Sequence, residues 1–172
     1  MKNCNDGNGA TLLAQIEKHR LLLTDCMAEI AAAEAQDVPL LGRSKRAGVL
    51  IAGLIENYYT CLETIFLRIS QYFENDLAAD RWHRDVLDRM TLEIESLRPR
   101  VISEAVFEDL LELMRFRHFK RYYFGTAYDW ERLDALLIRL RRLHEPLLTQ
   151  IEAFTRFLRE TTQSPPDKVL PP

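Results

Sequence analysis

The residues whose types and spacing suit chemistry lie near the end of a predicted helix over residues 104–124. One face of this helix is apolar over its first turns and becomes basic and aromatic where it continues, through Arg117, His118, Arg121 and Tyr122. At about 100° per residue, Arg117 and Arg121 lie one turn apart on that face. A buried arginine must meet an anion or a partner acid. The pattern therefore predicts either an anion-binding site or an ion pair.

The segment from Arg115 to Arg142 is basic in an otherwise acidic chain. It holds eight Lys and Arg against three acidic residues, a local charge of +5; the whole chain carries −3, which leaves −8 for the remainder. Such segregation favours a phosphate-bearing ligand, while the acidic remainder suppresses general adhesion to nucleic acid. Arg115, Lys120 and Arg121 are the candidate phosphate contacts. The alternative is a solvated basic face, since helices tolerate charge runs.

Neither a metal nor a cofactor is expected from the motifs. The chain has no P-loop, dinucleotide glycine fingerprint, GxSxG elbow or HExxH sequence. Asp80 with His83 is the only candidate metal pair, and it lacks the repeated Glu-x-x-His of carboxylate-bridged bundles. Histidines near apolar stripes are usually core residues with a hydrogen-bond partner. Any catalysis is therefore expected to be metal-independent acid–base chemistry.

Length and composition indicate one ordinary globular domain. The 172 residues are 47% hydrophobic and 28% charged, enough for a core that needs no disulfide or structural metal. The three cysteines form no CxxC pair, which favours free thiols in a reducing compartment. The first residues are polar, and no apolar run approaches the ~20 residues that span a bilayer. The sequence therefore predicts a cytoplasmic protein with no membrane contact.

Apolar residues recur with helical spacing through most of the chain, and no useful length alternates with period two. Helices are predicted over 11–36, from Ser44 for about 30 residues, from Asp80 until Pro99, over 104–124, and from Asp129 onward, with Pro146 kinking or splitting the last. The fold class is an all-α, up-and-down bundle of four long helices plus a shorter fifth. Residues 10–162 form this single domain, and disordered tails are expected at 1–9 and at the Pro-rich 163–172.

The helix over 104–124 has a second apolar patch, made by Phe116, Phe119 and Tyr123. A helix in a monomeric bundle does not need two apolar faces. The patch therefore favours a subunit contact, with a homodimer as the simplest assembly.

Three stretches together resemble one family. They are Glu56-Asn57-Tyr58-Tyr59-Thr60 with Glu63, Trp82-His83-Arg84-Asp85-Val86-Leu87 with Met90, and Arg115-Phe116-Arg117-His118-Phe119 leading to Asp129-Trp130-Glu131-Arg132-Leu133. They are similar to the HepT-like branch of the HEPN superfamily, small helical ribonuclease toxins paired with a minimal nucleotidyltransferase antitoxin. The resemblance spans about residues 45–160.

The resemblance implies a homodimer in which two copies of an Arg-x4-His motif face each other across a cleft that cuts RNA. Arg117 matches the family arginine, which would hold the scissile phosphate and stabilise transition-state charge. Tyr122 stands where active members place histidine, and Phe124 where many have the tyrosine that the antitoxin modifies with AMP. A phenol, with a reference pKa of about 10, is a poor base near neutral pH. His118 lies roughly 100° around the helix from Arg117, so it can act only from another angle.

Three hypotheses remain open. The leading one is a HepT-like protein that binds RNA and a nucleotidyltransferase, with weak ribonuclease activity because the motif reads Arg117-x4-Tyr122. The alternative is a non-catalytic helical adaptor that positions substrate for a nucleotidyltransferase. A structural bundle with a merely solvated basic face is the third, and it predicts no salt-dependent affinity for RNA.

Overall fold

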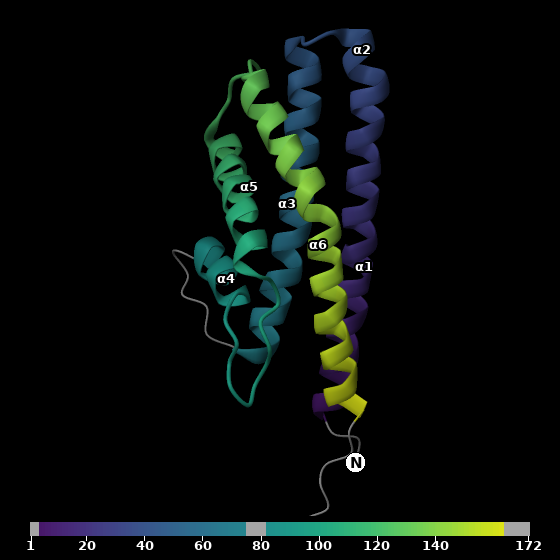
Figure 1. The fold of residues 1–172 in the computed structure, drawn as a ribbon, viewed down its shortest axis with the longest axis vertical. Helices are drawn as coiled ribbons and strands as arrows, with labels where there is room; N and C mark the ends of the chain where they lie inside the picture. The colour runs from purple at the N-terminus through teal and green to yellow at the C-terminus, as the bar shows by residue number, and fades with distance from the viewer. Residues whose placement is uncertain (1–3, 75–81, 164–172) are drawn as a thin grey trace, which may run out of the picture.

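The chain forms a helical bundle in the computed structural model, which describes residues 4–74 and 82–163 (Figure 1). The elements are α1 Cys4–Ala32, the π-helical turn η1 Ala33–Asp37, α2 Val38–Leu41, α3 Lys45–Phe73, α4 Trp82–Met90, α5 Glu104–Tyr122 and α6 Trp130–Gln163. Helix α3 is central, because it contacts α1, α4, α5 and α6. The predicted all-α bundle of four long helices plus a shorter fifth, α4, is confirmed. In the described ranges the only β-type pairing is an isolated bridge between Ile94 and Arg98.

Helix α1 begins earlier than its predicted start at residue 11. Residues 4–9, expected to be part of a disordered tail, are helical. Gly9 permits this, since a Cβ there would lie 2.3 Å from Thr162 Cγ2. The missing side chain lets α1 pack closely against the end of α6, and Figure 1 shows both ends at the same end of the bundle. Residues 1–3 and 164–172 lie outside the described residues.

The helical path also continues past Asp37 and Pro39, where the sequence predicted an end. The π-helical turn makes this possible, because the Val38 N–H bonds to the Ala33 carbonyl five residues back. Pro39 then falls in the first turn of α2, where a missing N–H costs nothing. Gly42, with φ of 63°, makes the real stop.

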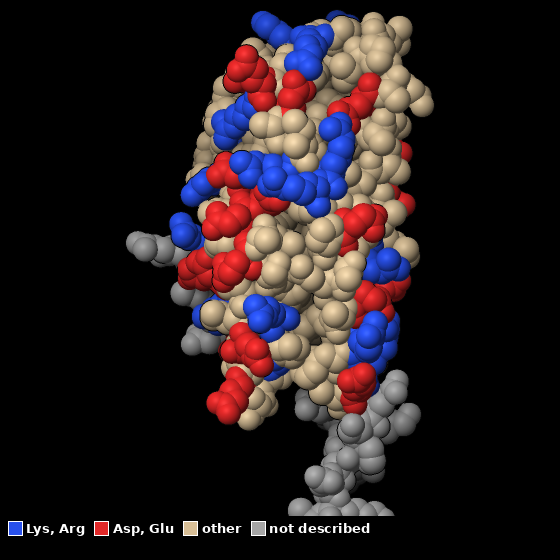
Figure 2. Space-filling view, viewed as in Figure 1, with Lys and Arg blue, Asp and Glu red and all other residues tan. Residues whose placement is uncertain are grey.

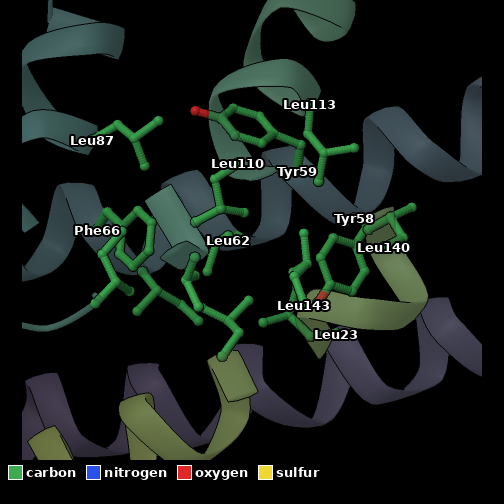
Figure 3. Packing of buried hydrophobic residues seen from close by; sticks show 14 of the residues in the cluster. Leu23, Tyr58, Tyr59, Leu62, Phe66, Leu87, Leu110, Leu113, Leu140 and Leu143 are labelled. Carbon is green, nitrogen blue, oxygen red and sulfur yellow. The ribbon is translucent and has the colours of Figure 1, made fainter. Parts of the chain in front are cut away.

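Helix α3 buries the predicted face. Its start is capped by Ser44, whose hydroxyl accepts the Ala47 N–H at 3.3 Å, as expected. Tyr58 points toward α1 and α6, while Tyr59 points toward α5 (Figure 3). Both rings are fully buried, so neighbouring positions on one helix serve two different contacts.

Helix α4 ends at Met90, not at Pro99 as predicted. The reason is Arg98, whose side chain is entirely buried and forms an ion pair with Glu74. Its guanidinium also donates to three backbone carbonyls, those of Arg89, Leu92 and Pro99. These bonds satisfy the end of α4 and close the loop behind it. Leu97, predicted to face inward, is exposed. The expected cap Asp80 and the side chain of His83 lie outside the described residues.

Helix α6 runs without a break, so Pro146 does not split it. The helix changes direction near its middle (Figure 1), as expected where a proline removes one backbone hydrogen bond. Asp129 begins the helix as predicted, with its carboxylate accepting the Glu131 N–H at 3.0 Å.

Most of the second apolar patch, made by Phe116, Phe119 and Tyr123, packs against other residues of the same chain. Phe116 is buried against α6 and the loop before it, with its ring 6.3 Å from that of Tyr128. Tyr123 packs edge-on against Tyr128 and donates its hydroxyl proton to the Ala127 carbonyl. The inference that a monomeric bundle has no use for this patch was therefore wrong. Only Phe119 keeps a substantial exposed surface.

Candidate functional site

Arg117 is held between α5 and α3 by two side chains of α3. Its Nη2 lies 3.0 Å from Glu63 Oε2, and its Nε–H donates to Thr60 Oγ1 at 3.2 Å. The side chains of Arg117 and Glu63 are only 14% and 5% exposed. The basic face of α5 thus meets an internal carboxylate, which was one of the two predicted outcomes. Two of the five guanidinium N–H groups are used in these contacts.

Glu63, an acidic residue of the first stretch that carries the family resemblance, is buried on α3. It is buried because its side of α3 is covered by the basic side of α5. Glu56, two turns earlier on α3, forms an ion pair with Lys120, one turn beyond Arg117 on α5. The sequence did contain a sign of these two ion pairs. One helix carries two acidic residues seven positions apart, and another carries two basic residues three positions apart.

The predicted proton-transfer residues lie on the outer side of α5. Tyr122 is 66% exposed, and His118 is also exposed. The two rings meet edge-on with centroids 5.1 Å apart. Arg117 faces α3 whereas Tyr122 faces solvent, since five residues turn a helix by roughly 140°. One chain therefore does not bring Arg117 and Tyr122 to a common point.

Tyr59 lies close to Glu63 and Arg117, but its hydroxyl is not a candidate for proton transfer near neutral pH. Burial raises its pKa far above the ordinary value for tyrosine, the charge of Glu63 raises it further, and Arg117 opposes them. The phenol therefore stays protonated and serves the packing between α3 and α5.

Most of the basic run is already engaged in ion pairs. Arg115 pairs with Glu112, Arg141 with Glu34, and the buried Asp109 takes both Arg139 and Arg142. Figure 2 shows the consequence on one face, where blue and red side chains lie next to each other. With Arg117 and Lys120 also paired, the described contacts leave two of the eight basic residues without an ion pair, Arg121 and Arg132.

The phosphate contacts expected from the sequence are therefore not equivalent. Arg121 remains exposed and available, whereas Arg115 and Lys120 each have an acidic partner. Arg132 was not a candidate from the sequence. No local pattern identifies it, because what sets it apart is its tertiary contact with the Phe116 and Phe119 rings of α5. Phe124 stands on the loop after α5 and is 94% exposed.

The described residues offer neither a cluster of metal ligands nor a membrane-spanning helix. Within residues 4–74 and 82–163, no three His, Cys, Asp or Glu side chains gather in the way a metal site would require. None of the helices in these ranges is long and apolar enough to cross a bilayer.

Comparison with known protein families identifies a family for this chain. A family described as HepT-like protein matches residues 50–158, which runs from α3 to α6 and includes the Arg117 site. No solved structure matches the chain.

Proposed function

We propose, from the premise that this chain belongs to the HepT-like family, that it is a HEPN-type toxin-family protein that binds RNA and cuts it slowly without a metal ion. The binding residues are Arg117 and Arg121. His118 and Tyr122 are the proton-transfer groups. The observation that carries the proposal is the fixed Arg117, since a guanidinium held by Glu63 and Thr60 loses little entropy when a phosphate reaches it.

The proposed site needs two copies of the chain. Arg117 and Tyr122 point in directions roughly 140° apart on one helix, so they cannot flank the same phosphate from a single α5. Arg117 keeps part of its side chain exposed and has three further N–H donors, so a second α5 related by a two-fold axis can bring Tyr122 of the other copy to this exposed edge. A homodimer with its cleft along α5 is therefore part of the proposal.

RNA supplies its own nucleophile in this chemistry. The 2′-OH oxygen attacks the adjacent phosphorus, the bond from phosphorus to the 5′-oxygen breaks, one proton leaves the 2′-OH, and one proton reaches the 5′-oxygen. Arg117 stabilises the negative charge that builds on the phosphate. A phenol is a poorer general base than the histidine of the family motif, so Tyr122 takes part in the proton transfer slowly and limits the rate, while His118 assists from another angle.

Restoring histidine at position 122 tests this division of roles. Tyr122→His is expected to raise the cleavage rate of a purified preparation by ~10²–10⁴, the contribution of a positioned general base. The double variant Glu63→Gln with Arg117→Met removes both charges of the pair and is expected to weaken RNA binding by 1.5–3 kcal/mol. Cleavage is followed with labelled RNA in the presence of a chelator. Arg156→Gln, an exposed arginine elsewhere on α6, is the control.

Two results would contradict the proposal. Robust wild-type cleavage that survives Tyr122→Phe but is lost in His118→Ala would remove Tyr122 from the mechanism. No cleavage by either the wild type or Tyr122→His, with RNA binding unchanged in the double variant, would leave the helical adaptor as the better account.

The resemblance also supports a minimal nucleotidyltransferase as partner. Phe124 occupies the position of the family's modified tyrosine, and its near-complete exposure suits a residue that a partner enzyme must reach. Phenylalanine has no hydroxyl to accept AMP. We expect no AMP transfer to the wild type and transfer to Phe124→Tyr when the partner and ATP are present, measured as a mass increase.

A further inference from the structure

The last turns of α5 carry three exposed rings in a row. His118, Tyr122 and Phe119 follow one another around the helix surface and cover roughly 100° of its circumference, with Arg121 roughly 60° before His118. Phe119 is 36% exposed and stacks on Tyr123, with centroids 4.8 Å apart and planes 24° apart. This set of His118, Tyr122 and Phe119 is called the aromatic strip below.

Arg132 of α6 borders the far side of the strip. Its guanidinium lies 4.6 Å from the centroid of the Phe119 ring and 5.5 Å from that of Phe116. A guanidinium packed over rings uses its flat face, so the N–H donors around its edge stay free for a phosphate. Among the described residues that line a small cavity of about 130 Å³ at this point, Asp129 is the one with a carboxylate, and it already caps α6.

We propose that the aromatic strip is a binding platform for unpaired bases of single-stranded RNA, with Arg121 and Arg132 holding phosphates at its two sides. The inference rests on the proposed RNA function and specifies its substrate as single-stranded. The exposed rings of His118 and Tyr122 can stack on any base, Phe119 holds the Arg132 guanidinium in place, and a guanidinium at each side follows the backbone. Duplex RNA buries its bases in the helix and offers these rings nothing to stack on.

The charges at the strip favour RNA over a protein partner. Arg121 and Arg132 are the two basic residues of the Arg115–Arg142 segment that the described contacts leave without an ion pair. An apolar protein surface covering the strip would desolvate both guanidinium groups without supplying an anion. A polyanion supplies one at each side.

Binding of a fluorescein-labelled, twelve-nucleotide oligouridine to the full chain tests the platform by fluorescence anisotropy. Phe119→Leu keeps an apolar side chain and loses the ring that holds the Arg132 guanidinium, and it is expected to weaken binding by roughly 2- to 30-fold, the range for one cation–π contact. Phe119→Tyr keeps the ring and is expected to bind as the wild type does. Arg132→Gln is expected to lower the slope of log affinity against log salt by about 0.7, the value for one phosphate contact on a single strand.

Control measurements separate this inference from the function on which it rests. Arg156→Gln, on the same helix as Arg132, should leave affinity and salt slope unchanged, and circular dichroism should show every variant folded. A duplex of equal length should bind at least about tenfold more weakly than the single strand.

Wild-type affinity in both Phe119→Leu and Arg132→Gln would overturn the platform while leaving the Arg117 site intact. Loss of a dimer in Phe119→Leu with unchanged affinity would assign the strip to a subunit contact. No binding by the wild type at low salt would refute the RNA function itself.

Discussion

Removing the Glu63 carboxylate should destabilise the protein far more than removing the Glu56 carboxylate, although each forms an ion pair with a basic residue of α5. Breaking a buried pair by deleting one partner costs about 3–5 kcal/mol. Arg117 is 14% exposed and keeps its hydrogen bond to Thr60, so it recovers part of this cost. We therefore expect Glu63→Ala to lower the free energy of unfolding by about 2–3 kcal/mol. For a domain of this length, that lowers Tm by about 5–10 °C.

Glu56→Ala is the matched control, because it makes the same chemical change on the same helix. The side chains of Glu56 and Lys120 are 25% and 21% exposed, so water screens their attraction. A pair of this kind contributes about 0–1 kcal/mol. Helix propensity changes equally in the two variants, and the difference between them reports the environment alone. Urea unfolding followed by circular dichroism gives both free energies from midpoints with a common slope.

Equal losses in Glu63→Ala and Glu56→Ala would refute the reasoning, since burial would then not distinguish the two pairs. The double variant Glu63→Gln with Arg117→Met supplies a second check. Removing both charges leaves neither partner unpaired, so the double variant should be more stable than Glu63→Ala. A double variant as unstable as the single one would show that packing, not the charge pair, sets the loss.

Two further predictions concern other buried polar groups. Arg98→Ala should cost about 3–5 kcal/mol, because Glu74 loses its buried partner and three carbonyls lose a donor; a urea midpoint within error of the wild type would contradict the capping role of Arg98. Burial lowers the pKa of His144, which bonds to the Tyr58 hydroxyl at 2.9 Å, while Glu145 opposes the shift. The unfolded chain then binds the proton more readily, so stability is complete above about pH 6.5 and falls as pH decreases below it; unfolding from pH 7.5 to 5 should show this loss, and His144→Gln should reduce it.

The helical bundle was predictable because the residues that specify each helix lie within that helix or directly before it. Each long helix carries an apolar stripe with helical spacing, and Ser44 and Asp129 mark two starts by their side-chain chemistry. The ends of α1 and α4 were less predictable, because they depend on tertiary contacts. Gly9 allows a close approach between helices, and Arg98 caps a helix end from eight residues away.

The same distinction applies to the candidate site. Arg117, His118, Arg121 and Tyr122 could be named from one helix, since a helix fixes the order of its own side chains. The partners of Arg117 and Arg141 could not, because these ion pairs join α5 or α6 to an element far away in the sequence. Six of the eight basic residues between Arg115 and Arg142 turned out to be paired. The local charge of +5 therefore overstated the positive surface that a ligand meets.

Under the proposed RNA function, this pairing would explain how an acidic protein can still select a polyanion. Basic residues that are neutralised by carboxylates fix α5 and α6 in register and add little to the outer potential. Arg121 and Arg132 remain without ion pairs in the described contacts, and they stand on the two sides of the aromatic strip. A duplex would find only these isolated charges, whereas a single strand also finds rings for its bases. The proposed selectivity for single-stranded RNA therefore rests on how few basic residues lack an ion pair and on the aromatic rings that lie between them.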